Sequence, residues 1–426
     1  MKKTRKTVCQ HHVGIESGVR HAERVSGLER REDRDEAMEM IVKSFPDSPQ
    51  MAIEMPRARY KGIAFDPGLT RVVVADGRVV SAVVMAPRSV RFGSVLVPAM
   101  TVGPVATRTE YRGKGYCAVA MNDATREMRK RGVLLAYLAG SCPLYARFGY
   151  FRFMVVSLGR VRVADADREA LPGRLRRMTR ADLPRVAELY ERANKGRIMS
   201  AARDAALWQW LLTCGVHSWL FPSPKVIVDD QHRVRGYVTF KKTDGMVVEE
   251  IIVPEDEASS RVAMGALSRE ARSRKLEEFV LAFSWNSPLG LFLRRLVGVQ
   301  VTMHNRNAGP LLKIVDFPAL MRALRPLFAQ RLKASGARFS GVRFNLASEI
   351  GAAGFEVAGN KINVGEAVRG ERVCIPQYWL SGLITGYWSV QDVMHDPKVK
   401  LSARLRPLME IVFPAGWPYA YRGDNY

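Results

Sequence analysis

Apolar and polar residues in the first part of the chain follow the pattern of a mixed α and β fold. Residues Asp33 to Phe45 place apolar side chains on one helical face and acidic side chains in the first turn, which is typical of a helix N-terminus. Strands are predicted for Arg71 to Ala75 and Val79 to Met85, which an Asp76-Gly77 hairpin turn separates. The uncharged, β-prone run from Val95 to Thr107 predicts a longer strand.

The next stretch, which ends at Tyr150, has the order of turn, helix and strand that holds phosphates. A basic turn, Arg112-Gly113-Lys114-Gly115, precedes a helical segment from about Tyr116 to Arg131, and an apolar strand covers Val133 to Ala139. Glycines let the backbone approach a ligand closely, and the unpaired amides of a helix N-terminus attract anions. Neither a Gly-x-Gly-x-x-Gly fingerprint nor a Walker A loop occurs in this stretch. We expect Val155 to Val163 to close this domain as its last strand.

A second domain is predicted after the charged stretch from Ala164 to Arg177, because the order of helices and strands is repeated there. In position, Val253-Pro254-Glu255-Asp256-Glu257 corresponds to the basic glycine turn, but it has no glycine and carries three carboxylates. Carboxylates repel an anion, so residues 167–306 are interpreted as a second copy of the first fold that has lost its ligand site. An unrelated α/β domain is the alternative.

The remaining residues predict a further mixed domain. A short strand at Leu311 to Val315 precedes a helix, strands follow at Val342 to Leu346 and Gly354 to Val357, and a buried helical stretch covers Trp379 to Met394. The chain closes with a segment rich in proline and aromatic residues, from Phe413 to Tyr426, which suits docking better than fraying.

Composition indicates a globular protein of several domains. The chain has 426 residues, of which 47% are hydrophobic and 25% charged. Its five cysteines are odd in number and include no Cys-x-x-Cys pair, which argues against a disulfide framework or a zinc site and favours a reducing cytoplasm. No signal peptide is visible, and the longest uncharged run, Val373 to Gln391, contains proline, glycine and glutamine. We therefore predict a cytoplasmic protein without a membrane span.

Charge changes this picture in two places. Residues 1–27 are predicted to be a basic flexible tail; metal binding by Cys9, His11 and His12 is the less favoured alternative, because no fourth ligand is near. The net charge of +24 attracts anions such as coenzyme A, nucleic acid or acidic lipid, although genome composition is the simpler explanation. No stripe of Lys and Arg interleaved with aromatic residues occurs, so nucleic-acid binding is a minor hypothesis. A strongly cationic ligand would need a locally acidic cleft.

The glycine turn and the residues after the second strand resemble a known family. Arg112-x-x-Gly115-x-Cys117 is similar to the Arg/Gln-x-x-Gly-x-Gly/Ala signature of the GNAT acyltransferases, with the small Cys117 in the place of Gly or Ala. A tyrosine followed by Arg-Phe-Gly-Tyr, at Tyr145 to Tyr150, is similar to the enhanced-intracellular-survival (Eis-like) branch of that family.

The resemblance implies an α/β (α+β) fold of tandem GNAT domains followed by a domain similar to sterol carrier proteins. After the tail, a catalytic GNAT domain would cover residues 28–166. A degenerate GNAT-like domain without a coenzyme site would cover residues 167–306, and the sterol-carrier-protein-like domain would cover residues 307–426.

The resemblance also implies a site for acetyl-CoA as co-substrate and no metal. Tyr145 would protonate the departing thiolate, since phenol and thiol pKa values of roughly 10 and 8.5 nearly balance; a core tyrosine is the alternative. The α-carboxylate of Tyr426, where the family commonly has Phe, would act as base for the amine; a frayed terminus is the alternative. The coenzyme would be held by a strand edge, the glycine turn with its helix, and the end of the next strand: Val105, Ala106, Thr107, Arg112, Gly113, Lys114, Gly115, Tyr116, Cys117, Ala118, Gly140 and Ser141.

Two functions of different class follow. The first is an acetyl-CoA-dependent N-acetyltransferase that acts on an aminoglycoside, another polyamine or a protein lysine, and the resemblance implies a homo-oligomer, often a hexamer. The second is a non-catalytic ligand-binding or assembly protein that uses the sterol-carrier-like domain. The intact glycine turn and Tyr145 favour the first function.

Overall fold

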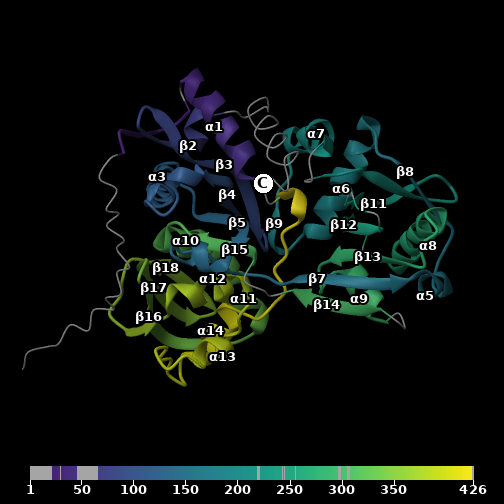
Figure 1. Cartoon of the computed structure of the whole chain (residues 1–426). Helices are drawn as coiled ribbons and strands as arrows, with labels where there is room; N and C mark the ends of the chain where they lie inside the picture. Colours follow the sequence, from purple (N-terminus) through teal and green to yellow (C-terminus); the bar gives the residue numbers. More distant parts are fainter. Residues whose placement is uncertain are drawn as a thin grey trace, which may run out of the picture.

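The computed structural model describes residues 22–28, 30–45, 66–217, 221–241, 243, 245–254, 256–295, 299–304 and 308–424. These residues form three β-sheets, of eight, seven and four strands, with helices packed on them, so the fold is α+β (Figure 1). No helix among them is long and apolar enough to cross a membrane. Most of the predicted tail lies outside the described residues, but Arg24–Ser26 form strand β1, whose backbone pairs with the next strand of the first sheet.

The first sheet contains the strands that were predicted for the first part of the chain. Its central strands are antiparallel except β4 and β5, which run parallel. One further strand, β9 (Ile198–Ala201), pairs with β3 beside the main path. In sheet order the strands are β1, β2 (Thr70–Ala75), β3 (Arg78–Phe92), β4 (Val95–Thr107), β5 (Leu135–Ser141), β15 (Ala308–Ile314) and β6 (Phe151–Arg152).

Two helices cover opposite faces of the first sheet. Helix α1 (Arg31–Ser44) packs Ala37 and Ile41 against one set of strand side chains, and helix α3 (Tyr116–Lys130) packs Met121 and Ala124 against the alternate set. Because successive strand residues point to opposite faces, each helix buries its own half of the β-prone runs. The helices and strands predicted for this part of the chain are confirmed to within two or three residues, except that β3 continues seven residues beyond the predicted end at Met85.

The second sheet has its own core beneath helix α8 (Glu257–Ser273). Helices α5 (Val163–Arg168) and α9 (Pro288–Arg295) lie beside α8, whereas α6 (Leu183–Asn194) and α7 (Ala205–Thr213) pack on the other face. In sheet order the strands are β14 (Gln300–His304), β7 (Val156–Arg162), β13 (Glu278–Phe283), β12 (Val247–Ile252), β11 (Val234–Phe240), β10 (Lys225–Asp229) and β8 (Gly173–Arg177).

Two strands lie in a different sheet from the one predicted. The expected closing strand of the first domain is β7, and it pairs with β13 and β14 in the second sheet. Its place in the first sheet is taken by β15, which pairs with β5 over seven residues and had been assigned to the third domain. The apolar pattern predicts that each segment is a strand, but the partner of a strand depends on residues that are distant in sequence.

The third sheet, in the order β18-β17-β16-β19, lies under the remaining helices. The helix predicted over Trp379 to Met394 is divided, because Gly386 has a φ of 83° and a Cβ there would lie 2.7 Å from the Pro414 carbonyl oxygen. The strands are β16 (Phe339–Ser348), β17 (Gly351–Gly359), β18 (Lys361–Gly365) and β19 (Glu371–Cys374), and the helices are α10 (Phe317–Ala323), α11 (Arg325–Ser335), α12 (Gln377–Thr385), α13 (Val390–Met394) and α14 (Arg406–Val412).

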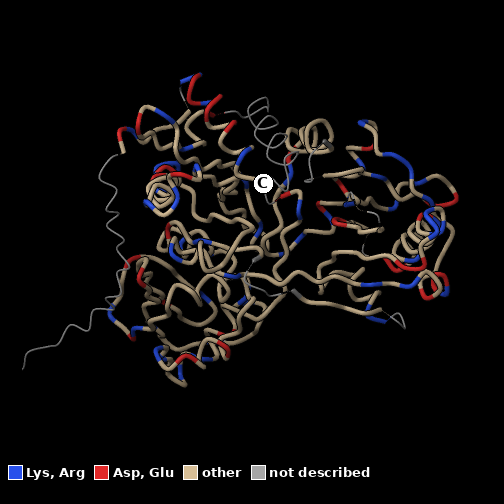
Figure 2. Tube along the Cα trace, in the orientation of Figure 1, with Lys and Arg blue, Asp and Glu red and all other residues tan. Residues whose placement is uncertain are grey.

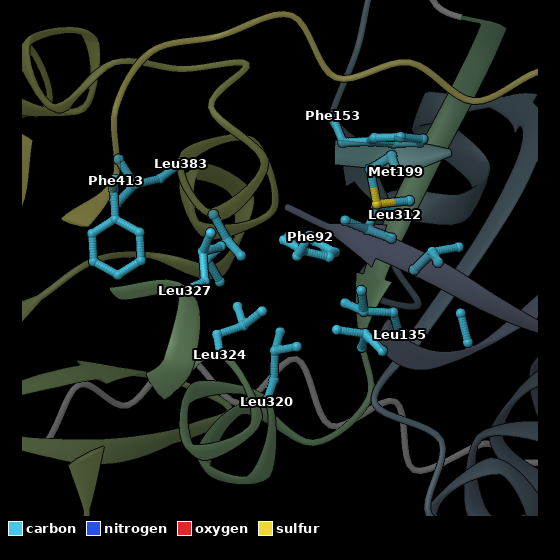
Figure 3. Close-up of a cluster of buried hydrophobic side chains, with 14 of the residues drawn as sticks. Phe92, Leu135, Phe153, Met199, Leu312, Leu320, Leu324, Leu327, Leu383 and Phe413 are labelled. Carbon is cyan, nitrogen blue, oxygen red and sulfur yellow. The ribbon is translucent and has the colours of Figure 1, made fainter. Parts of the chain in front are cut away.

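A single apolar cluster joins the first sheet to the third sheet and its helices, which together form the third part of the chain (Figure 3). Burial of each such side chain contributes about 1.5–3 kcal/mol, so the two parts stabilise one another. The labelled members of the cluster are each 4% exposed or less. They come from four strands of the first sheet, from three helices and from connecting segments: Phe92, Leu135, Phe153, Met199, Leu312, Leu320, Leu324, Leu327, Leu383 and Phe413.

The end of the chain crosses back toward the first sheet. After α14 the backbone is extended, and the amide of Tyr419 donates to the carbonyl of Ile198 on β9 over 3.0 Å. A last turn, η5 (Arg422–Asp424), contacts β12. Residues 417–424, which we call the C-terminal segment, therefore lie where the first and second sheets meet (Figure 1).

Candidate functional site

The first sheet opens between two of its central strands. Strands β4 and β5 are paired over three residues, and the last pair is Thr101 with Tyr137. Beyond this pair β4 remains bound to β3 as far as Thr107, and β5 remains bound to β15 as far as Ser141. Within the described chain, the edge of β4 that faces β5 therefore has no strand partner after Thr101. The predicted coenzyme-binding residues Val105, Ala106 and Thr107 lie on this part of β4.

The glycine turn follows β4 directly. Gly113 and Gly115 have φ values of 76° and 89°, in the left-handed region that favours glycine, and Gly115 is the N-cap of α3. The amides of Ala118 and Val119 make the first helical bonds, both to the Gly115 carbonyl, and no side chain caps the helix. The amides that precede Ala118 thus have no acceptor within the helix.

Two exposed cations flank this turn. Arg112 donates through Nε to the Thr107 carbonyl over 3.2 Å, which ties the turn to the end of β4, and the Lys114 ammonium lies 5.1 Å from the ring centroid of Tyr111. A helix N-terminus with free amides and adjacent cations suits a phosphate group. The binding of an anionic ligand by Arg112 to Ala118 stays a prediction, with which this geometry is compatible.

Tyr145 lies against the end of the next strand. It is on the short helix α4 (Cys142–Ala146), and its ring covers Gly140, where a Cβ would lie 2.9 Å from Cδ2 of the ring and closer still to Cε2. The ring is half-buried and meets the ring of Tyr150 edge to face, with centroids 6.1 Å apart. Glycine at position 140 is thus required for the tyrosine to occupy this place. Ser141, the last residue of β5, is exposed.

The two halves of the predicted site belong to one packed cluster. Tyr145, Cys142 and Cys117 all pack on the core beneath α3. Burial raises the pKa of the Cys117 thiol, against a smaller opposing effect of the Arg147 guanidinium, which disfavours the thiolate form. Among the described residues no group of three His, Cys, Asp or Glu side chains is placed to hold a metal ion.

The second sheet has a corresponding opening, between β12 and β13. Strands β12 and β13 run parallel for two pairs, up to Val248 with Leu281, and helix α8 follows β12. Here the N-cap is Asp256, whose side chain accepts from the Ser259 amide over 2.7 Å, and Glu257 bonds to Arg261 over 3.0 Å. The chain's own carboxylates thus occupy the position that an anion would need.

Residues that the sequence analysis did not identify hold the end of the chain at the first opening. The Asp424 main-chain carbonyl accepts from the Tyr137 hydroxyl over 2.7 Å, at the residue where β5 parts from β4. Its carboxylate accepts from Arg203, which is also paired with Glu250. The aromatic character of the chain end was the only available signal, since nothing in the sequence distinguishes Arg203 or Glu250. Tyr426, the predicted base, lies outside the described residues.

Comparisons with known proteins agree with this geometry. Residues 28–153 match the acetyltransferase (GNAT) domain family. No curated protein matches the sequence. The chain therefore carries a GNAT N-acetyltransferase domain at its N-terminal end, as the sequence predicted, and such domains use an acyl-CoA as co-substrate.

Solved structures share the fold over nearly the whole chain. A protein from Enterococcus faecalis described as a probable N-acyltransferase has a TM-score of 0.75 at 17% identity, over 93% of this chain and 98% of its own. A GCN5-related N-acetyltransferase from Anabaena variabilis has a TM-score of 0.72 at 16% identity, over 93% and 98%. Eis1 from Mycobacterium abscessus has a TM-score of 0.67 at 17% identity, over 95% and 100%. The expected Eis-like architecture is confirmed at the level of the fold.

The glycine turn generates a testable expectation. Replacement of Gly115 by Asp would place a carboxylate at the free amides, so we expect acyl-CoA affinity to fall by at least about 100-fold in calorimetry. Gly132→Asp is the matched control, because Gly132 also has a positive φ of 70° but lies past the C-terminal end of α3, where a Cβ meets nothing. Equal affinity of two folded variants would contradict the assignment of the turn.

Proposed function

We propose that the protein is an acetyl-CoA-dependent N-acetyltransferase in which an amine attacks the thioester directly in a ternary complex. The observation that carries the proposal is the opening between β4 and β5, with an uncapped helix N-terminus after one strand and Tyr145 after the other. The open edge offers main-chain donors to the pantetheine arm and the thioester oxygen. A preorganised donor at the developing oxyanion is commonly the largest contribution to acyl transfer.

Each predicted residue has a separate task in this mechanism. The backbone of Val105, Ala106 and Thr107 would align the coenzyme along β4, and Gly140 and Ser141 would form the opposite wall. The free amides from Gly113 to Cys117 would hold the pyrophosphate, assisted by the charges of Arg112 and Lys114, whereas the Ala118 amide closes the first helical turn on Gly115. Tyr116, Cys117 and Ala118 contribute through their backbone, since their side chains are wholly or partly buried in the core.

Tyr145 is proposed as the general acid for the departing thiolate. Tyr145→Phe keeps the ring over Gly140 and deletes only the hydroxyl, so we expect turnover to fall by roughly 10²–10⁴-fold with little change in acetyl-CoA affinity. Tyr378→Phe is a suitable control, because Tyr378 is an exposed tyrosine of the third part of the chain that hydrogen-bonds to Asp396. Near-normal turnover of the Tyr145 variant would return this residue to a packing role.

The α-carboxylate of Tyr426 is proposed as the base for the acceptor amine. The anchoring of Asp424 at Tyr137 supports it, because Tyr426 is two residues from Asp424 in the sequence. An α-carboxylate has a pKa of roughly 3.5, so it is ionised at neutral pH and attracts an ammonium group. Because it is a weak base unless burial raises its pKa, a water molecule would relay the proton from the amine.

Two changes at the chain end test this base. Removal of Tyr426 and addition of several glycines after it both displace the carboxylate, so each should lower turnover by at least about 100-fold. Acetyl-CoA affinity should be unchanged in both, which serves as the internal control. Full activity of the extended chain would show that the base lies elsewhere.

The acceptor is proposed to be a cationic amine, such as an aminoglycoside, another polyamine or a protein lysine. Three carboxylates, of Glu249, Glu250 and Asp424, meet where the C-terminal segment docks, together with the guanidiniums of Arg203 and Arg422 and with Lys241 near Glu249. A concentration of carboxylates in an otherwise cationic chain supports an acceptor that carries an ammonium group. Figure 2 shows Lys and Arg distributed over all parts of the trace, which does not favour a nucleic-acid stripe.

The finer architecture is also a proposal. The parallel pair β12 and β13 followed by α8 supports a second, degenerate GNAT fold over residues 167–306, with a sterol-carrier-protein-like domain over 307–426, except that β7 belongs to the second sheet and β15 to the first. The four free cysteines of the described chain agree with a reducing cytoplasm. A non-catalytic binding protein is less well supported, because the glycine turn is intact.

We further propose that the protein assembles into a homo-oligomer, as the Eis-like resemblance implies. Sedimentation at working concentration should report a species larger than the 47.7 kDa chain. A monomer at every concentration would contradict this proposal without affecting the proposed reaction.

A further inference from the structure

Arg203 joins the second sheet to the C-terminal segment through a buried charge network. Its side chain has no exposed area, and its terminal nitrogens donate to both oxygens of Glu250 over 2.7 and 2.9 Å. Its Nε donates to Oδ1 of Asp424 over 2.6 Å. The ring centroids of Tyr190 and Trp208 lie 4.2 and 4.9 Å from the guanidinium carbon. The cation is therefore surrounded by partners from several elements and from the chain end.

The network has one more carboxylate than it has cations. Arg203, Glu250 and Asp424 are each 1% exposed or less at the side chain, so one positive charge balances two negative charges away from solvent. Burial acts to lower the pKa of Arg203, but the two carboxylates raise it well above its ordinary value, so the guanidinium remains charged. The second carboxylate is stabilised by hydrogen bonds, because Oδ2 of Asp424 accepts from the Tyr190 hydroxyl over 2.9 Å.

Asp424 also connects this network to the opening of the first sheet. Its main-chain carbonyl accepts from Tyr137, the last residue of β5 that is paired with β4, and its carboxylate accepts from the Ala201 amide of β9 over 3.4 Å. One residue of the C-terminal segment is thus fixed from both sides, by the first sheet through its backbone and by Arg203 through its side chain.

We propose that Arg203 is a positioning residue for the acetyl transfer: through Asp424 it holds the C-terminal segment at the opening between β4 and β5. This inference rests on the proposed function for its catalytic consequence. In this proposal the second sheet supports the C-terminal segment, because Glu250 of β12 binds Arg203. Glu250 is itself fixed within the sheet, since its Oε1 accepts from the Tyr237 hydroxyl of β11 over 2.5 Å. A group that is misplaced by about 1 Å can lose roughly 100-fold in rate, so this support affects turnover more than coenzyme binding.

Asp424→Asn in the full chain tests the proposal. The amide keeps the size of the side chain and one acceptor but loses the charge, and its nitrogen cannot accept from Tyr190. We expect backbone amides of residues 417–424 to exchange with deuterium at least about tenfold faster, since loss of one partner of a buried charge pair commonly shifts an equilibrium by that factor or more. We also expect kcat to fall about tenfold or more, with the KM for acetyl-CoA within about twofold of wild type.

Asp182→Asn is the matched control for a purely structural effect. Asp182 accepts two bonds from Arg176, over 2.8 and 2.6 Å, within the second part of the chain, and none of its hydrogen bonds involves the C-terminal segment. Both variants should lower the melting temperature, but only Asp424→Asn should accelerate exchange in residues 417–424 and lower kcat.

A second variant separates charge from geometry. Arg203→Lys keeps the positive charge but cannot bridge two carboxylates with a planar fork, so it should reproduce both effects of Asp424→Asn. Deuterium exchange of residues 417–424 at the wild-type rate in either variant would overturn the inference. So would an equal loss of kcat in Asp182→Asn when its melting temperature falls by the same amount. Failure of the unchanged chain to bind acetyl-CoA would instead contradict the proposed function, and the exchange comparison would still decide whether Arg203 holds the segment.

Discussion

The arrangement of the molecule depends on the hydrogen bonds that hold β5 when it parts from β4. A strand buried in a sheet must satisfy its backbone amides and carbonyls, and within the described chain the pairing of β5 with β4 ends at Tyr137. Strand β15 supplies a partner along all seven residues of β5, from Leu135 to Ser141. Because β15 comes from the part of the chain after the second sheet, the opening exists only when distant segments are folded together.

The same open geometry has opposite outcomes in the first two sheets. In the first, a glycine N-cap leaves the amides of α3 available and exposed cations stand beside them. In the second, Asp256 caps α8 and satisfies its first turn from within the chain, and the Arg422 guanidinium of the C-terminal segment pairs with Glu249 of β12. One opening is thus suited to an anionic ligand, and the other is occupied by the protein's own charged groups.

Buried charge links these two openings. Arg203 is enclosed by carboxylates and aromatic rings, and such an arrangement contributes little net stability compared with an apolar core of equal volume. What a directional network of this kind adds is a defined geometry for the chain end, because Asp424 satisfies several donors only in one position. The apolar cluster that contains Phe92 and Leu312 contributes the stability, and the charged network fixes the position of the C-terminal segment.

The sequence by itself determined the local elements and the chemistry of the turn. Alternating apolar runs predict β2 to β5, and glycines at Gly113 and Gly115 indicate a turn that only residues tolerant of positive φ adopt, because these signals arise from neighbouring residues. The absence of glycine before α8 likewise predicts its lost ligand site. Only the tertiary structure decided that β7 lies in the second sheet, that β15 lies in the first, and that Arg203 meets Asp424, because strand partners and buried ion pairs join residues far apart in sequence.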